Sequence, residues 1–145
     1  MNRETIYSAV FTKWQALLTN GAGFVTVSRR LDNFANVPAI LQPALYQLQA
    51  QEKTAPVRGV PPKRTLSLEL FVYATSADPA VAPSSVLNPL LDAVDAILAP
   101  DPVTQVQNFG IAGVQHIWIE GVTKIAEGVL DNQAVAVIPV EILIA

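Results

Sequence analysis

The sequence contains no cysteine, which excludes disulfide bonds, zinc–thiolate sites and thiol catalysis and suits a reducing compartment. His116 is the single histidine, so a histidine-rich metal site is excluded as well. The glycines form no GxxxxGK[ST] or GxGxxG pattern, and Asn20-Gly21-Ala22-Gly23 is more simply a helix stop followed by a turn. We therefore expect neither an enzyme nor a protein that holds a cofactor or a metal.

Charged residues are also scarce, at 14% of the chain against about a quarter in ordinary soluble domains. The shortage has two equally good interpretations: a surface that other subunits partly cover, or a weakly charged, alanine-rich monomer. The net charge is −3, so the chain as a whole has no electrostatic footprint for nucleic acid.

Long apolar runs are missing too. No stretch approaches the roughly 18 residues that a membrane span needs, and the opening MNRETIYSAVF lacks the features of a signal peptide. What is present is a 145-residue chain of which 51% is apolar, which is enough for one core. We predict a single domain over residues 1–145 with no membrane partner.

The strongest periodic signal predicts a helix over residues 84–98, where apolar residues recur every three or four positions and leave Asp92 and Asp95 on a polar face. Its N-cap is either Ser84 or Ser85, or else Asn88 followed by Pro89 as the first helical residue. A second helix is predicted over residues 4–18. A charge in place of Leu91 or Val94 is expected to unfold the subunit.

Strands are predicted at the segments that alternate or are apolar throughout. In one of these, residues 44–52, Tyr46 and Leu48 face the core and Gln47 faces water. The final strand is apolar on both faces, as in a central strand, but Pro139 then requires a bulge or an edge that pairs on one side only. The predicted strands cover residues 24–28, 44–52, 65–75, 114–121 and 134–145, with a turn at 131–132.

This order predicts an α+β fold: a mostly antiparallel sheet of four to five strands with two main helices packed against it. The apolar C-terminal ILIA is expected to be tied into the sheet or docked on another subunit.

Residues 53–64 hold three prolines and four basic residues, and we interpret them as an exposed basic loop. In a monomer the loop is solubilising; in an assembly it is an arm that contacts an acidic neighbour. Its cations and the adjacent pair near residue 30 are Lys53, Arg58, Lys63, Arg64, Arg29 and Arg30.

Three further features are weighed as possible sites. His116 lies on an alternating strand beside Trp118 and is best explained as structural. Asp92 and Asp95 are one helical turn apart, and a solvated face explains them better than a shared metal does. Phe71 and Tyr73 make one strand face aromatic, so that face is expected to meet a helix, a second layer or another subunit.

The chain resembles the tail-terminator (tail-completion) proteins of long-tailed bacteriophages along nearly its whole length. The resemblance is carried by stretches of family character and not by a catalytic signature. These stretches are RETIYSAVFTKW, SRRLDNFANVPAILQPALYQLQ, RGVPPKRTLSLELFVY, LNPLLDAVDAIL, APDPVTQVQ, HIWIEG and EGVLDNQAVAVIPVEILIA.

The resemblance implies a homohexameric ring that caps the finished tail tube, stops tube polymerisation and offers a joining surface to a neck or head-completion protein. Genomic DNA passes through the lumen without sequence-specific binding. The implied location is the head-proximal end of the virion tail, with assembly in the host cytoplasm. Asp92 and Asp95 would then face solvent or the lumen.

A closed ring needs two different complementary patches on each subunit. We expect the 53–64 loop with Arg29 and Arg30 on one patch, and Phe71, Tyr73 and Trp118 on the other. The alternatives are another head–tail joining or minor tail protein and, from a different class, a small soluble enzyme or ligand-binding α+β domain, which would need a pocket with convergent polar groups.

Overall fold

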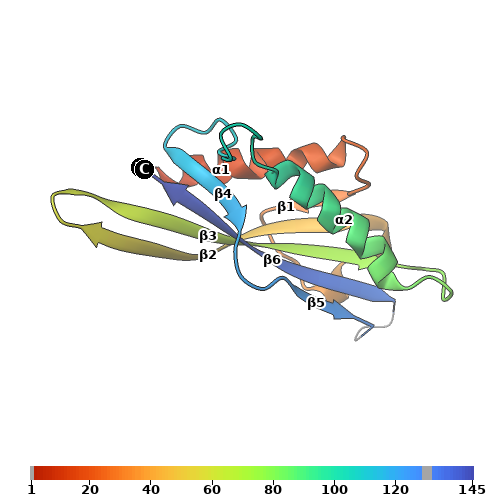
Figure 1. Ribbon diagram of the computed structural model, residues 1–145. Coiled ribbons are helices and arrows are strands. Elements are labelled where there is room, and N and C mark those ends of the chain that lie inside the picture. Colours follow the sequence, from red (N-terminus) through yellow and green to blue (C-terminus); the bar gives the residue numbers. More distant parts are fainter. Residues whose placement is uncertain (1, 129–131) are drawn as a thin grey trace.

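A six-stranded, mostly antiparallel sheet forms the centre of the computed structural model, which describes residues 2–128 and 132–145 (Figure 1). Among the described residues, the only parallel pair of strands is β1 with β2. In spatial order the path is β1 (Thr26–Ser28), β2 (Ala44–Val57), β3 (Val60–Thr75), β6 (Gln133–Ile144) and β4 (Val114–Ile119), and β5 (Lys124–Glu127) also pairs with β6. The predicted α+β class and element order are confirmed, and the turn expected at 131–132 begins outside the described residues.

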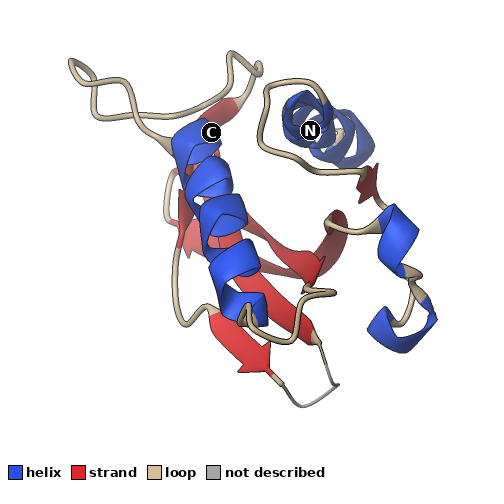
Figure 2. Ribbon diagram, turned by 90° about the vertical axis from the view of Figure 1, so that its right-hand side faces the viewer, coloured by secondary structure: helices blue, strands red, loops and turns tan. Residues whose placement is uncertain are grey.

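Two helices, α1 (Arg3–Gln15) and α2 (Pro83–Leu98), cover the same face of the sheet (Figures 1 and 2). The stripe predicted for α2 is the buried one, with Leu87, Leu90, Val94 and Leu98 packed on β3 and β6. The helix therefore gains its stability from the sheet that covers its apolar face.

The start of α2 differs from both predictions. Ala82 is the N-cap residue and Pro83 occupies the first turn, so neither serine nor Asn88 caps the helix. A residue far away in sequence supplies the missing acceptor: the Glu127 carboxylate on β5 accepts a hydrogen bond from the Ser84 N–H at 3.0 Å. The Ser84 side chain and then the Ser84 N–H lower the pKa of Glu127. The negative charge also matches the positive end of the helix dipole.

The prediction that Gln47 faces water was wrong. Gln47 is 2% exposed and lies beneath α1. Its amide oxygen accepts a hydrogen bond from Trp14 Nε1 at 2.8 Å, and its amide nitrogen donates to the carbonyl oxygen of Tyr7 at 3.1 Å. A polar side chain tolerates burial when its groups are paired in this way, so Gln47 is an exception on a strand whose Gln49 and Gln51 are exposed.

The prediction that residues 53–64 form a loop was also wrong, although their exposure was predicted correctly. β2 and β3 continue outward as a hairpin that turns at Arg58-Gly59, with Val57 paired to Val60. Gly59 has φ +82°, which glycine adopts without strain. The three prolines, Pro56, Pro61 and Pro62, all fall within the register shift between the Ala55–Lys63 and Val57–Val60 pairs. A proline removes no ladder hydrogen bond where the ladder is already interrupted.

Pro139 is reconciled with a central strand in a similar way. On one side β6 pairs continuously with β3; on the other side its partner changes from β4 to β5. The Pro139 carbonyl accepts from the Glu120 N–H just beyond the end of β4, so the Pro139 nitrogen faces this gap. The C-terminus is tied into the sheet, since Ile142 and Ile144 are buried and the Ala145 N–H donates to the Gly113 carbonyl.

The opposite face of the sheet is covered only over part of its length. Tyr46 and Tyr73 pack there against Val37 and Phe34, in the segment that includes the short 3-10 turns Phe34–Asn36 and Ala39–Leu41. Side chains along the rest of this face, on β6, remain half-buried.

Candidate functional site

The most prominent surface feature is the outer end of the β2–β3 hairpin, residues 51–63, which we name the arm. Every residue of the arm is exposed, and the arm projects well beyond the layer of helices (Figure 1). Residues 53–63 carry the cations Lys53, Arg58 and Lys63 and no acidic residue. At the tip, the paired Val57 and Val60 are 45% and 57% exposed, so the arm presents an apolar end surrounded by positive charge.

An ion-pair network fixes the base of the arm to α1. The Glu52 carboxylate accepts hydrogen bonds from Arg3 at 2.7 and 2.8 Å and from Arg64 at 3.1 Å. The hydrogen bond from Arg3, aided by Arg64, lowers the pKa of Glu52 to about 2. Arg64 is thus engaged within the subunit, which separates it from the other three cations predicted for this segment.

Of the predicted pair Arg29 and Arg30, Arg29 is likewise engaged within the subunit. The Arg29 guanidinium donates to the Glu4 carboxylate and to the Ser8 hydroxyl on α1, and it lowers the pKa of Glu4. Arg30 is exposed. The first turn of α1 therefore holds both Arg29 and, through Arg3 and Glu52, the base of the arm.

The predicted aromatic patch is only partly at the surface. Tyr73 is 2% exposed, its hydroxyl donates to the Asp32 carbonyl at 2.9 Å, and burial raises its pKa to about 12. Tyr73 thus belongs to the interior of the isolated subunit. Phe71 and Trp118 are half-buried on the sheet face away from the helices, opposite Val137 and Glu141 of β6.

His116 lies on β4, two residues before Trp118. Its ring stacks on Trp118 with centroids 5.2 Å apart, and its Nδ1 accepts a hydrogen bond from the Gln107 N–H at 3.1 Å. Among residues 2–128 and 132–145, no group of three or more acidic or histidine side chains is arranged to hold a metal ion.

Asp92 and Asp95 border a feature that the sequence did not reveal. A groove of about 300 Å³, which we name the α2–β5 groove, runs between α2 and the edge of the sheet. Its apolar lining comes from Leu91, Ile119, Ile125 and Ile138. The two aspartates, both exposed, stand on the helix side of it. Four different elements contribute to the groove, so no contiguous pattern in the sequence indicates it.

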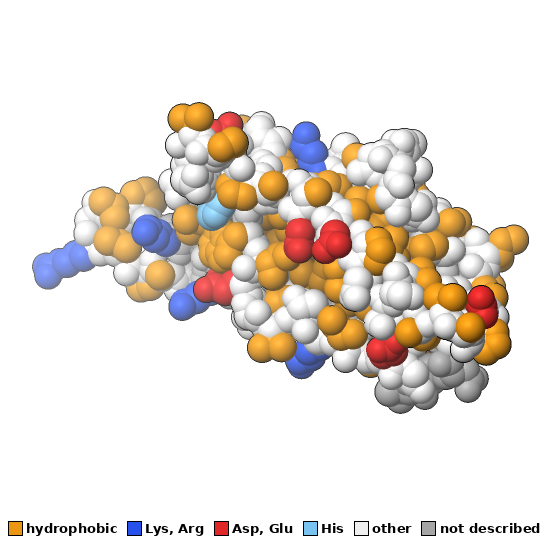
Figure 3. Space-filling model, turned by 45° about the vertical axis from the view of Figure 1, so that its right-hand side comes forward, with side chains coloured by type: hydrophobic (Ala, Val, Ile, Leu, Met, Phe, Trp, Pro, Cys, Tyr) orange, Lys and Arg blue, Asp and Glu red, His pale blue; other side chains and the backbone are white. Residues whose placement is uncertain are grey.

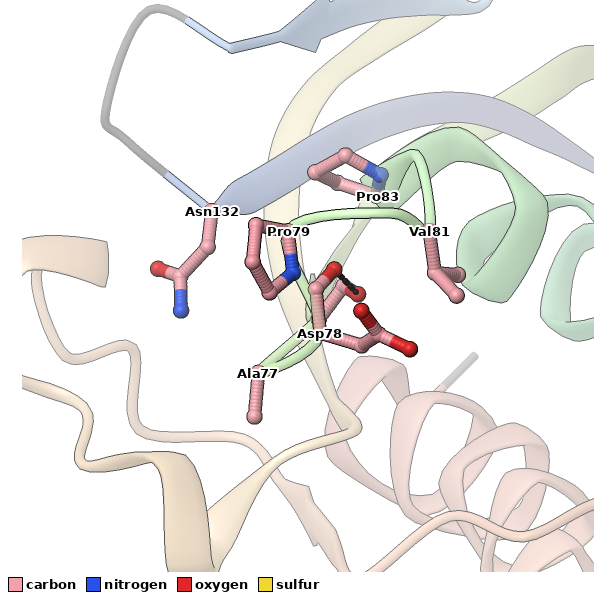
Figure 4. Close-up of a pocket in the computed structure, with 7 residues that line it drawn as sticks. Ala77, Asp78, Pro79, Val81, Pro83 and Asn132 are labelled. Carbon is pink, nitrogen blue, oxygen red and sulfur yellow. Dashed lines mark hydrogen bonds between the residues drawn. The ribbon is translucent and has the colours of Figure 1, made fainter.

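A second hollow of about 340 Å³ lies in the loop between β3 and α2 (Figure 4). Ala77, Pro79, Val81 and Pro83 line much of it, and Asn132 stands at one side. The polar groups of Asp78 are used locally, because its carbonyl accepts from Ser76 Oγ and its carboxylate accepts from the Ala80 N–H. The hollow therefore brings together no convergent set of titratable groups among the residues described.

Within the described part of the chain, no helix combines the length and the apolar character needed to cross a membrane. Comparison with protein-family models and with curated proteins gives no match. Among solved structures, the chain is similar to a protein that carries no functional name, with a TM-score of 0.62 and 12% identity. The match covers 100% of this chain and 96% of the other, and at this identity it shows the fold alone.

Proposed function

We propose that the chain is a structural subunit of a phage tail, of the tail-terminator type. Copies of it form a ring that caps the finished tail tube, stops further polymerisation and presents a joining surface to the neck or head, with DNA passing through the lumen. The proposal rests on the resemblance of the sequence to this family and on one structural observation, the arm.

The arm supports the proposal because its side chains contribute little to the stability of their own subunit. A two-stranded ribbon is marginal on its own in water, and every residue from 51 to 63 is exposed. The ion pairs of Glu52 nevertheless anchor its base to α1. An anchored, projecting and basic ribbon with an apolar tip is typical of a segment that is stabilised on a neighbouring molecule.

The mechanism of termination is geometric. One face of the ring matches the exposed end of the tail tube and the other face does not, so binding removes the site at which the next tube subunit would add. Such a ring needs two complementary patches per subunit, and no proton transfer or covalent step takes part.

The test is electron microscopy of purified tail tubes mixed with the protein. We expect a ring at one end of each tube, and tubes that no longer elongate when tube protein is added. Tubes that remain uncapped and continue to grow at saturating concentrations of the protein would refute the proposal.

A further inference from the structure

The arm and the α2–β5 groove have opposite charge and matching apolar character. The arm carries Lys53, Arg58 and Lys63 around two exposed valines. The groove has an apolar floor, and Asp92 and Asp95 stand beside it. Figure 3 shows acidic side chains amid hydrophobic surface over the body, and basic side chains on the projecting arm.

The floor of the groove is only partly covered by α2, whose residues line one side of it. Ile125 pairs with Ala136 and Ile119 pairs with Val140, so both isoleucines point to the face that the helices cover. Ala136 and Val140 are nevertheless fully buried, whereas Ile125 is 53% exposed. The groove is thus an uncovered continuation of the core.

The nearest basic residue in sequence does not neutralise the groove. Lys124 precedes Ile125 on β5, and successive strand residues point to opposite faces, so Lys124 points away from the groove. Lys124 is also absent from the groove lining, which leaves Asp92 and Asp95 as its charged members among the described residues.

The arm of a subunit is too far from the groove of the same subunit to fill it. Ile138 of the groove pairs with Leu70 on β3, and Val60 at the arm tip is ten residues further along the same strand. At about 3.3 Å per residue, the continuous strand places the tip about 33 Å away and pointing outward. Any arm that occupies the groove must come from another molecule.

We infer that the arm of one copy docks in the α2–β5 groove of the next. Val57 and Val60 cover Ile125 and Leu91, while Arg58 and Lys63 pair with Asp92 and Asp95. The contact joins two different patches, so each copy uses both once, and repetition of it gives a ring when the rotation from copy to copy closes. The inference rests on the proposed function because it identifies the contact between the subunits of the proposed ring.

A cross-linking experiment tests this contact directly, because the cysteine-free chain permits cysteines to be placed singly. A Val60→Cys variant is mixed with an Ile125→Cys variant under mild oxidation, and disulfide-linked dimers are measured by non-reducing electrophoresis. We expect this pair to cross-link at least about tenfold faster than the control pair of Val60→Cys with Val103→Cys, whose second site is 89% exposed on a different loop. Equal rates for the two pairs would overturn the inference.

A charge-swap experiment tests the pairing independently. Arg58→Glu with Lys63→Glu on the arm, or Asp92→Lys with Asp95→Lys beside the groove, should each weaken self-association at least about tenfold in sedimentation measurements. Mixing the two reversed variants should restore association, because each then offers the partner that the other lacks. The controls Lys13→Glu and Asp32→Lys reverse exposed charges elsewhere and should leave association unchanged.

The outcomes separate this inference from the proposed function. Rings that form on tubes without the Val60–Ile125 cross-link, or arm variants that lose tube binding while they still self-associate, would refute the docking and keep the function. Cross-linked oligomers that do not cap tubes would refute the function and keep the docking. A protein that stays monomeric without a cross-link, even with tubes present, would refute both.

Discussion

The buried amide of Gln47 permits a quantitative test of how much its hydrogen bonds stabilise the core. Its oxygen accepts from Trp14 Nε1 at 2.8 Å, and its nitrogen donates to the Tyr7 carbonyl. Gln47→Leu keeps a side chain of similar length but removes both hydrogen bonds. The indole N–H of Trp14, which is itself fully buried, then has no partner.

The expected cost follows from these two losses. An unpaired buried donor costs about 1–3 kcal/mol. The Tyr7 carbonyl loses less, because residue 7 lies inside α1 and keeps the hydrogen bond that the helix gives it. The added apolar surface of leucine returns part of the loss, so we expect a net destabilisation of about 2 kcal/mol. At about 2.1 cal/mol/K per residue, this lowers Tm by roughly 7 °C.

The assay is urea unfolding followed by circular dichroism, at one fixed protein concentration so that any self-association is constant. Gln49→Leu is the matched control, because Gln49 lies on the same strand and is exposed; its change should stay within about 0.5 kcal/mol. In a Trp14→Phe background the indole donor is gone, so Gln47→Leu should cost less than about 1 kcal/mol. If Gln47→Leu is as stable as Gln49→Leu, the buried hydrogen bonds do not stabilise the core as argued.

Three other predictions follow from the described contacts. Val94 lies on the buried face of α2 and is fully buried, so Val94→Asp places an unpaired carboxylate in the core and should abolish the folded circular dichroism spectrum, whereas Val94→Ala should fold with a loss of about 2 kcal/mol. Glu52 has a folded pKa of about 2 against an ordinary 4.5, so its contribution is full above pH 4.5 and is lost as pH falls towards 2. Glu52→Gln should therefore lower Tm at pH 7 and match the wild type near pH 2; a Tm difference that does not vary with pH would contradict this. Gly59→Val forces a β-branched residue to φ +82° and should accelerate hydrogen exchange at Val57 and Val60 while leaving Leu70 protected; unchanged exchange at the tip would show that the turn is not strained.

Periodicity in the sequence was sufficient to predict the fold class, the two helices and most of the strands. The α2 stripe is the clearest case, because seven apolar residues at spacings of three and four form one stripe on a helix, and the strands before and after it in the sequence can cover that stripe. The cations of the arm were also found from the sequence, since exposed, proline-rich and basic segments are visible in composition alone. The route of the chain through them was not, because prolines usually argue against strands and here they coincide with a register shift.

The remaining errors share a cause, which is that a residue's environment depends on partners distant in sequence. Gln47 looks solvent-facing until α1 covers it, and Tyr73 looks available for an interface until the segment around Val37 packs on it. The side chain that accepts a hydrogen bond from the first turn of α2 is that of Glu127, 43 residues beyond Ser84. Asp92 and Asp95 were visible as an acidic helix face, but the groove beside them is formed together with Ile119, Ile125 and Ile138 from three strands.

Hydrophobic period and composition act locally along the chain, so they were enough to predict the two helices, most of the strands, their order and the charge of the projecting segment. Which polar groups are buried and paired, which arginines are engaged within the subunit and which hydrophobic edge stays open became known only from the tertiary structure. These features depend on the register of β6 against β3, β4 and β5 and on where the helices end. Contacts between segments that are distant in the chain leave no local pattern in the sequence.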